Sequence, residues 1–303
     1  MTLALLFPGQ GSQFVGMGKA LCDMSPAARA VFEEADEALG FSLSGLCFEG
    51  PEEELKRTAN TQPAILTHSV AAWRDLQARF PERLEGVAFA AGHSLGEYSA
   101  NVATGALTFA DAVLLVRQRG RFMQEAVPQG VGAMAAIVGL PPEQVEAACR
   151  EAAQGEVVSV ANFNSPEQTV IAGTAAAVAR ASAACTARGA KRAIPLAVSA
   201  PFHCALMAPA RERLRPLLEA TRFSDVAVPI VTNVDARPET RANALSDALA
   251  RQVDAAVRWV ESVRALAAEG VDRGLEVGPG NVLAGLVRRI DKRIRVESYG
   301  GDA

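Results

Sequence analysis

Strand-like and helix-like segments alternate along most of this chain, and that alternation constrains the fold more than any other feature. The apolar runs 2–7 and 87–91 are short, and each is followed by a glycine-containing turn before helical spacing resumes. A short apolar run between turns is typical of a strand buried on both faces of a parallel sheet. The sequence therefore predicts an α/β fold with a mainly parallel sheet.

Capping residues mark the ends of several predicted helices. Ser25 and Pro26 begin a helix that Gly40 ends, because serine caps well and proline fits the first helical position. Thr108 begins another, since Asp111 three residues later completes a capping-box-like pair. The remaining expected elements are a helix over 62–80, a helix from about 204, a strand over 228–233, helices near 241 and 255, a strand over 275–277, and a final helix and strand.

The middle of the chain has a different order of elements. Strands are expected over 132–140, 157–162, 168–173 and 192–198, with helices over 141–153 and 175–188. This β-α-β-β-α-β order is that of the ferredoxin-like unit. We therefore predict a small subdomain, residues 129–198, inserted into a large α/β domain made of residues 1–128 and 199–303.

Charge and hydropathy exclude several functional classes. The 303 residues carry a net charge of −4 without a long basic run, so no nucleic-acid partner is expected. No stretch approaches the roughly 20 apolar residues that span a bilayer, and the first apolar run lacks the basic region of a signal peptide. We therefore expect no membrane association and a cytoplasmic location. The five cysteines are widely spaced without a CxxC pair, which predicts buried thiols and no metal site.

The sharpest local signal is the sequence Gly92-His-Ser-Leu-Gly96, a G-x-S-x-G pattern between a predicted strand and a predicted helix. A sharp strand-to-helix turn exposes a serine hydroxyl, and glycines remove side chains that would clash there. The main-chain N–H of Leu95 would lie at a helix N-terminus, where it can stabilise an oxyanion. The pattern predicts that Ser94 is a nucleophile.

Three histidines are candidates for the base that such a serine needs. His93 is adjacent to Ser94 and is expected to point away from it, and His68 lies in a helix-like apolar segment. His203 follows the nucleophile in the chain and lies where a strand gives way to a helix, which is where α/β sheets place functional groups. We predict that His203 is the base.

Two further segments allow a structural and a functional interpretation. The loop from Phe7 to Gln13 is rich in glycine but does not match G-x-G-x-x-G, since Phe14 stands three residues after Gly11. It is either a simple turn or a second source of oxyanion hydrogen bonds. Arg119 shares a helix face with apolar residues and should point inward, either in a buried salt bridge or as a fork for a substrate carboxylate.

Six motifs that occur in order make the chain resemble a known family. They are FPGQGSQ from Phe7, GHSLGE from Gly92, RGRFMQ from Arg119, VANFNSP from Val160, PFH from Pro201 and EVGPGN from Glu276. Together they resemble the malonyl-CoA:acyl carrier protein transacylases, and also the acyltransferase domains of polyketide synthases. The resemblance implies a hydrolase-like α/β core with an inserted ferredoxin-like βαββαβ subdomain.

The resemblance also implies roles for individual residues. Ser94 would be the nucleophile and His203 the general base, with the carbonyl of Gln252 orienting the histidine. Main-chain amides of Gln10 and Leu95 would form the oxyanion hole. Arg119 would bind the malonyl carboxylate, and the residues that would line the substrate pocket are Met123, Asn162 and Phe202. Phe202 and Leu95 stand where the polyketide domains that take malonyl differ from those that take methylmalonyl.

The implied reaction transfers malonyl from malonyl-CoA to the phosphopantetheine thiol of an acyl carrier protein, in fatty acid or polyketide synthesis. Malonyl-CoA and the acyl carrier protein would be the partners, and no bound cofactor is expected. A serine thioesterase or acyl hydrolase on the same nucleophile is one alternative, against which an inward Arg119 argues. An inactive module that only docks a carrier protein is another, against which an intact Ser94 and His203 argue. The sequence carries no signal for oligomeric state.

Overall fold

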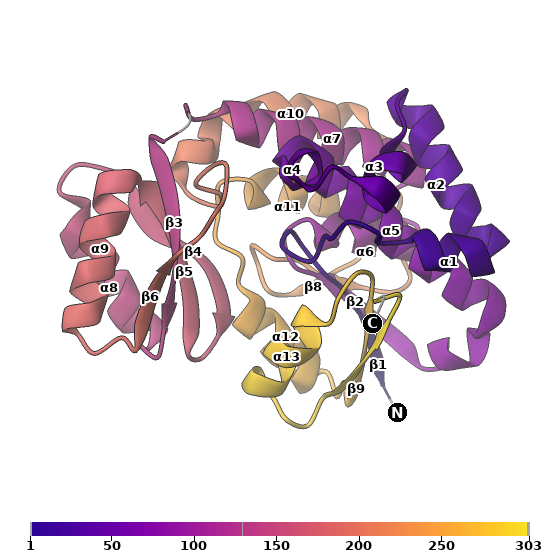
Figure 1. Cartoon of the computed structure of the whole chain (residues 1–303). Coiled ribbons are helices and arrows are strands. Elements are labelled where there is room, and N and C mark those ends of the chain that lie inside the picture. Colours follow the sequence, from indigo (N-terminus) through magenta and orange to yellow (C-terminus); the bar gives the residue numbers. More distant parts are fainter. Residues whose placement is uncertain (1, 129, 302–303) are drawn as a thin grey trace.

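The computed structural model describes residues 2–128 and 130–301. The predicted boundary between the large domain and the small subdomain falls at Gln129, which lies outside the described residues. The structure contains two separate sheets, as the alternation and the different order in the middle of the chain predicted (Figure 1). In the part of the chain that is described, no helix has the length and apolar character needed to cross a membrane.

The larger sheet has the strand order β10-β9-β1-β2-β7-β8 and is parallel except for the last pair. Its central strand β1 is buried at all five positions, which explains its continuous apolar sequence. The strands are β1 (Leu3–Phe7), β2 (Val87–Gly92), β7 (Ile230–Val231), β8 (Pro238–Glu239), β9 (Arg273–Val277) and β10 (Arg295–Tyr299).

Helices cover this sheet and enclose most of the apolar core. They are α1 (Lys19–Met24), α2 (Pro26–Leu39), α3 (Leu43–Glu49), α4 (Glu52–Lys56), α5 (Thr58–Arg79), α6 (Gly96–Thr104), α7 (Phe109–Glu125), α10 (Ala208–Ala220), α11 (Ala242–Gln252), α12 (Trp259–Ala268) and α13 (Val282–Ile290), with short 3₁₀ turns at Pro81–Leu84 and Ala205–Met207.

The capping signals located two helices correctly. The Ser25 side chain accepts a hydrogen bond from the N–H of Ala28 at the start of α2, and Gly40 ends that helix in the left-handed conformation with φ of 71°. The Thr108 hydroxyl accepts from the N–H of Asp111 at the start of α7.

Several predicted elements have different bounds: the strand expected over 192–198 ends at Pro195, and the helix expected from about 204 begins at Ala208. Helix α5 begins at Thr58 rather than residue 62, because the carbonyl of Arg57 accepts hydrogen bonds from Asn60 and Thr61 before Pro63 is reached. The strand expected over 228–233 is reduced to the two residues of β7, and the chain then leaves the sheet toward the predicted nucleophile.

The smaller sheet is antiparallel, with the order β4-β5-β3-β6, and helices α8 and α9 cover one of its faces (Figure 1). This confirms the predicted ferredoxin-like β-α-β-β-α-β pattern. A separate apolar cluster fills the space between these helices and the sheet. The elements are β3 (Gly132–Val138), α8 (Pro142–Ala153), β4 (Val158–Ser165), β5 (Gln168–Thr174), α9 (Ala175–Ala187) and β6 (Arg192–Pro195).

Strand β4 connects the small sheet to the rest of the molecule through main-chain hydrogen bonds. Val257, just before α12, donates its N–H to the carbonyl of Ala161, and its own carbonyl accepts from Phe163, both at 2.9 Å. These two bonds fix one edge of the small sheet beside the C-terminal end of the large sheet. Functional groups of parallel α/β sheets gather at that end.

Candidate active site

The turn that carries Ser94 joins β2 to α6, and at its two glycines it leaves no room for a side chain. A Cβ at Gly92 would lie 1.9 Å from the main chain of Gly96, and a Cβ at Gly96 would lie 2.0 Å from the carbonyl oxygen of Phe7. Ser94 itself has φ of 52°, in the left-handed region that L-residues rarely adopt. The two glycines of G-x-S-x-G are therefore required by close packing of the main chain.

Asn233, which follows β7, holds this turn from the side. Its Oδ1 accepts the N–H of Ser94 at 2.7 Å, and its Nδ2 donates to the carbonyl of Gly92 at 2.7 Å. One amide side chain thereby spans the turn and fixes the strained serine. No motif pointed to Asn233, although its position at the end of a predicted strand could have done so.

The hydroxyl of Ser94 is hydrogen-bonded to His203, with 2.7 Å between Oγ and Nε2. The other ring nitrogen, Nδ1, faces the carbonyl oxygens of Gln252 at 2.9 Å and Ala255 at 3.2 Å. Because carbonyls only accept hydrogen bonds, Nδ1 must carry the proton, and Nε2 is left to accept the serine proton. The pair therefore has the tautomer that a serine nucleophile requires.

His203 is held in its neutral form. It is only 4% exposed, and burial, followed by the positive charge of Arg119, lowers its pKa to about 3. Its φ of 59° is also in the left-handed region, so its orientation is fixed by the surrounding chain. A neutral imidazole is ready to accept a proton at any ordinary assay pH.

Arg119 points inward from α7, as its helix face predicted, and is 2% exposed. Its NH1 donates to Oε1 of Gln62 at 2.7 Å, and its NH2 donates to Oε1 of Gln252 at 2.9 Å and to Oγ of Ser94 at 3.1 Å. Within the described residues it forms no ion pair with a carboxylate. Of the two interpretations of Arg119, the structure therefore does not support the buried salt bridge.

Gln10, in the loop after β1, and Leu95, just before α6, line the same pocket as Ser94. Neither main-chain N–H donates to another group within residues 2–128 and 130–301. Two free main-chain N–H groups in one pocket can stabilise an oxyanion by donating hydrogen bonds to it.

A cavity of about 130 Å³ opens onto these groups. Both sheets contribute to its wall, since Met134 comes from β3 and the hydroxyl of Ser94 from the turn after β2. Gln252 lies behind the wall, where it contacts Arg119 and His203. The other predicted residues line the cavity together: Gln10, Ser94, Leu95, Arg119, Met123, Asn162, Phe202 and His203.

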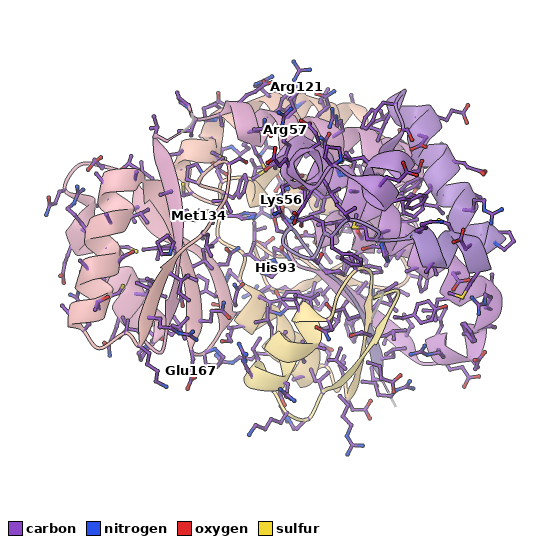
Figure 2. The ribbon with its side chains drawn as sticks, viewed as in Figure 1. Lys56, Arg57, His93, Arg121, Met134 and Glu167 are labelled. Atoms are coloured by element: carbon purple, nitrogen blue, oxygen red, sulfur yellow. The ribbon has the colours of Figure 1, made fainter. Side chains whose placement is uncertain are left out.

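The other two histidines have structural contacts. His68 is buried in α5, with Nε2 at 2.5 Å from the carbonyl of Gly300. His93 lies between the small sheet and the large part of the molecule (Figure 2), where its Nε2 is 2.8 Å from Oδ1 of Asn164 in β4. Neither ring is hydrogen-bonded to Ser94, so only His203 has the geometry of a base.

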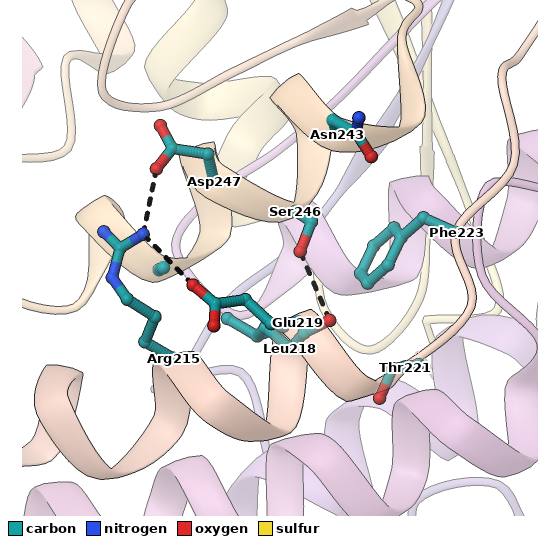
Figure 3. A pocket seen from close by; sticks show the side chains of 9 residues that line it. Arg215, Leu218, Glu219, Thr221, Phe223, Asn243, Ser246 and Asp247 are labelled. Atoms are coloured by element: carbon teal, nitrogen blue, oxygen red, sulfur yellow. Dashed lines mark hydrogen bonds and ion pairs between the residues drawn. The ribbon is translucent and has the colours of Figure 1, made fainter.

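A second cavity, of about 350 Å³, lies between α10 and α11 (Figure 3). Arg215 in its wall is paired with Glu219 and Asp247, and Ser246 donates to the carbonyl of Leu218. These polar groups are therefore already satisfied by one another. No cluster of three metal-ligating side chains occurs in the described part of the chain.

Comparison with known proteins finds similarity along nearly the whole chain. A family model described as an acyl transferase domain matches residues 4–297. The malonyl CoA-acyl carrier protein transacylase of Salmonella typhimurium is 54% identical over 287 residues, which cover 95% of this chain and 92% of that protein.

Solved structures give the same result. An acyl carrier protein S-malonyltransferase from Vibrio cholerae matches with a TM-score of 0.96 and 48% identity, over 100% of this chain and 98% of that one. A malonyl-transacylase solved in complex with its type II PKS acyl-carrier protein matches with a TM-score of 0.96 and 48% identity, over 100% of this chain and 97% of that one.

Proposed function

Because this chain belongs to the acyl transferase domain family, we propose that it moves a malonyl group from malonyl-CoA to the phosphopantetheine thiol of an acyl carrier protein. One observation carries the proposal. The Oγ of Ser94 lies 2.7 Å from Nε2 of His203 and 3.1 Å from NH2 of Arg119, so a nucleophile, a base and a carboxylate-binding cation meet at one atom.

In the first half-reaction, Ser94 attacks the thioester carbonyl of malonyl-CoA while His203 takes the proton from Oγ. The main-chain N–H groups of Gln10 and Leu95 stabilise the resulting oxyanion. The carbon–sulfur bond then breaks, His203 returns its proton to the sulfur, and coenzyme A leaves as the thiol. The product is a malonyl ester on Ser94.

In the second half-reaction, the thiol of the carrier's phosphopantetheine attacks this ester. His203 takes the thiol proton, the bond between the carbonyl carbon and Oγ breaks, and the proton returns to Ser94. The carbonyl of Gln252 holds the imidazole through Nδ1 in both steps. The kinetic pattern is ping-pong, and no resident cofactor takes part.

Arg119 selects the acyl group by pairing with its free carboxylate. Met123 and Asn162 shape the pocket around the malonyl group. Phe202 narrows the space that a branching methyl would need, and rejection of one methyl is worth about 1–3 kcal/mol. The enzyme therefore prefers malonyl to methylmalonyl without excluding it.

We infer that the active site lies between two parts of the chain, each of which lines one side of the cavity. We infer a large domain of residues 1–128 and 199–303 and a small subdomain of residues 129–198, which is supported by an apolar cluster contained wholly within residues 135–185. A cytoplasmic location suits an enzyme whose substrate and carrier partner are both soluble.

An assay that follows the malonyl group distinguishes transfer to the carrier protein from hydrolysis. Radiolabelled malonyl-CoA is mixed with the enzyme, with and without acyl carrier protein bearing phosphopantetheine, and malonyl-carrier is compared with free malonate. The proposal predicts that malonyl-carrier dominates and that Ser94→Ala forms neither product. Free malonate as the main product in the presence of carrier would instead identify a hydrolase.

A further inference from the structure

Glu97 is a fully buried carboxylate next to the active site, in the first turn of α6. Its Oε2 accepts hydrogen bonds from the N–H of Asn233 at 3.0 Å and from Nε2 of Gln252 at 2.9 Å. Its Oε1 has no partner within the described residues. A buried carboxyl group without a paired cation is costly, so its retention calls for an explanation.

Gln252 connects Glu97 to Arg119. The two hydrogens of Nε2 point to Oε2 of Glu97 at 2.9 Å and to the carbonyl of Ser94 at 2.8 Å. The opposite end of the same amide, Oε1, accepts from NH2 of Arg119 at 2.9 Å. An amide has one donating end and one accepting end. Oε2 of Glu97 and the carbonyl of Ser94 both accept from Nε2, so together they fix which end of Gln252 faces the guanidinium.

The orientation of Arg119 depends on this amide because no carboxylate holds it directly. NH2 lies between Oε1 of Gln252 and Oγ of Ser94, while Gln62 holds NH1. If Gln252 turned its amide over, an N–H would face a cation, and the guanidinium would have to move. Burial lowers the pKa of Arg119, and the neighbouring acidic groups of Tyr98 and Glu97 oppose that shift.

We propose that Glu97 is a positioning residue for malonyl recognition: through the Gln252 amide it holds the Arg119 guanidinium in line with Ser94. This inference rests on the proposed function, since it assumes that Arg119 binds the malonyl carboxylate. Glu97 itself touches neither the substrate nor the reacting atoms. Its loss should therefore impair acyl groups that carry a carboxylate far more than neutral ones.

Two substitutions of Glu97 distinguish the effect of its hydrogen bonds from the effect of its volume. Glu97→Gln keeps the shape and can place its carbonyl oxygen where Oε2 lies, so both donors stay satisfied. Glu97→Met keeps a similar volume but removes the acceptor. We expect Glu97→Met to raise KM for malonyl-CoA about 10- to 100-fold, the range for a lost hydrogen bond in a charged network, while KM for acetyl-CoA changes less than about threefold. Glu97→Gln should restore most of the malonyl affinity.

The readout is kcat and KM for malonyl-CoA and for acetyl-CoA with the same carrier protein. Equal losses for both substrates in Glu97→Met, or a loss of malonyl affinity in Glu97→Gln as large as in Glu97→Met, would overturn the proposal. A wild-type enzyme without preference for malonyl-CoA would instead refute the proposed function.

A further variant covers the case in which Glu97→Met does not fold, as judged by circular dichroism. Glu97→Asp keeps the charge but withdraws the acceptor by one methylene from Gln252. We expect a rise in KM for malonyl-CoA alone. A folded Glu97→Asp with unchanged preference between the two substrates would contradict the proposed role of Glu97.

Discussion

At the scale of single residues, the buried charge of Arg119 dominates the site. Its guanidinium is bonded to two neutral amides and one hydroxyl, and Nε has no partner among the described residues. A buried cation without a directly bonded anion is destabilising, and a bound carboxylate would remove that cost. The resting site is thus arranged for an anionic acyl group.

Arg119→Ala should therefore change substrate preference as well as rate. We expect kcat/KM for malonyl-CoA to fall by about 100-fold or more, because a charge-assisted pair is lost, while use of acetyl-CoA relative to malonyl-CoA rises. Arg121→Ala is the matched control, since Arg121 lies on the same helix but pairs with Glu125 at the surface. An unchanged ratio of malonyl to acetyl use in Arg119→Ala would remove Arg119 from substrate recognition.

The titration of His203 gives a second test at this scale. Burial and the charge of Arg119 lower its pKa to about 3, so the ring should stay neutral throughout ordinary assay conditions. In Arg119→Met the cation is gone, so the pKa of His203 should rise, while burial, which is the larger cause, still holds it below its usual value near 6.5. The ring nitrogens of the three histidines can be followed by ¹⁵N NMR. A midpoint near pH 6.5 in the wild type would contradict the described environment.

The titration of Glu97 should make the stability of the fold depend on pH. Burial raises its pKa from 4.5 to about 7, so between these values the folded protein binds the proton more tightly than the unfolded chain. Its contribution to stability is present below about pH 4.5 and is lost as pH rises toward 7. The stability of Glu97→Gln relative to wild type should thus increase from pH 5 to pH 8, by up to about 3 kcal/mol. Urea unfolding of the two proteins at pH 5 and pH 8 measures this difference in stability. A difference that does not change with pH would contradict the prediction.

Residues whose chemistry is visible in a short motif could be predicted from the sequence. Ser94 was predicted from its flanking glycines and His203 by comparing three candidates, and the two side chains lie within hydrogen-bonding distance. Glu97 stands in the motif GHSLGE but was given no role, and Asn233 was not found, because an asparagine after a short strand has no distinctive local pattern. Their importance comes from contacts across 136 positions of sequence, which only the folded chain reveals.

At the scale of elements, the connection from β2 to α6 is where main-chain packing and chemistry coincide. The carbonyl of Phe7 at the end of β1 lies against Gly96, and the carbonyl of His93 lies against Gly9. The first strand, its glycine loop and the serine turn are therefore packed main chain to main chain. This packing brings the N–H groups of Gln10 and Leu95 to the same cavity.

Gly96→Ala should break this arrangement. A Cβ there would lie 2.0 Å from the carbonyl oxygen of Phe7, so the strand and helix must separate, at a cost of about 3 kcal/mol or more together with loss of activity. Gly285→Ala in α13 is the matched control, since a Cβ there meets nothing within 4 Å, and helix propensity favours alanine by about 1 kcal/mol. Thermal unfolding of both variants gives the comparison. A Gly96→Ala protein as stable as Gly285→Ala would contradict the close packing of Gly96 against the carbonyl of Phe7.

Element types were predicted better than element ends. Capping residues fixed α2 and α7 because a cap acts within a few residues of its helix. The start of α5 was placed too late because its N-cap residue, Arg57, forms no capping hydrogen bond through its side chain and so gives no local signal. The shortness of β7 depends on β8 and Asn233, which are distant constraints that a local apolar run does not contain.

At the scale of the whole molecule, the active site requires both sheets. The large sheet supplies the serine turn and the loops after its strands, while β3 and β4 of the small sheet close the cavity with Met134 and Asn162. The order of elements was enough to predict two sheets of different type, since β-α-β-β-α-β differs from simple alternation. How the sheets meet could not be predicted, because the contact of Val257 with β4 is made by main-chain atoms that any sequence possesses.

Malonyl transfer at this site requires a nucleophile, a base and a cation that act on one malonyl group. Intact-protein mass spectrometry after rapid mixing with malonyl-CoA, followed by peptide mapping, tests this most directly. We predict that one malonyl group attaches to Ser94, that it disappears when acyl carrier protein bearing phosphopantetheine is added, and that Ser94→Ala gains none. A malonyl group at another residue, or none on the wild type while malonyl-carrier still forms, would contradict a malonyl-Ser94 intermediate.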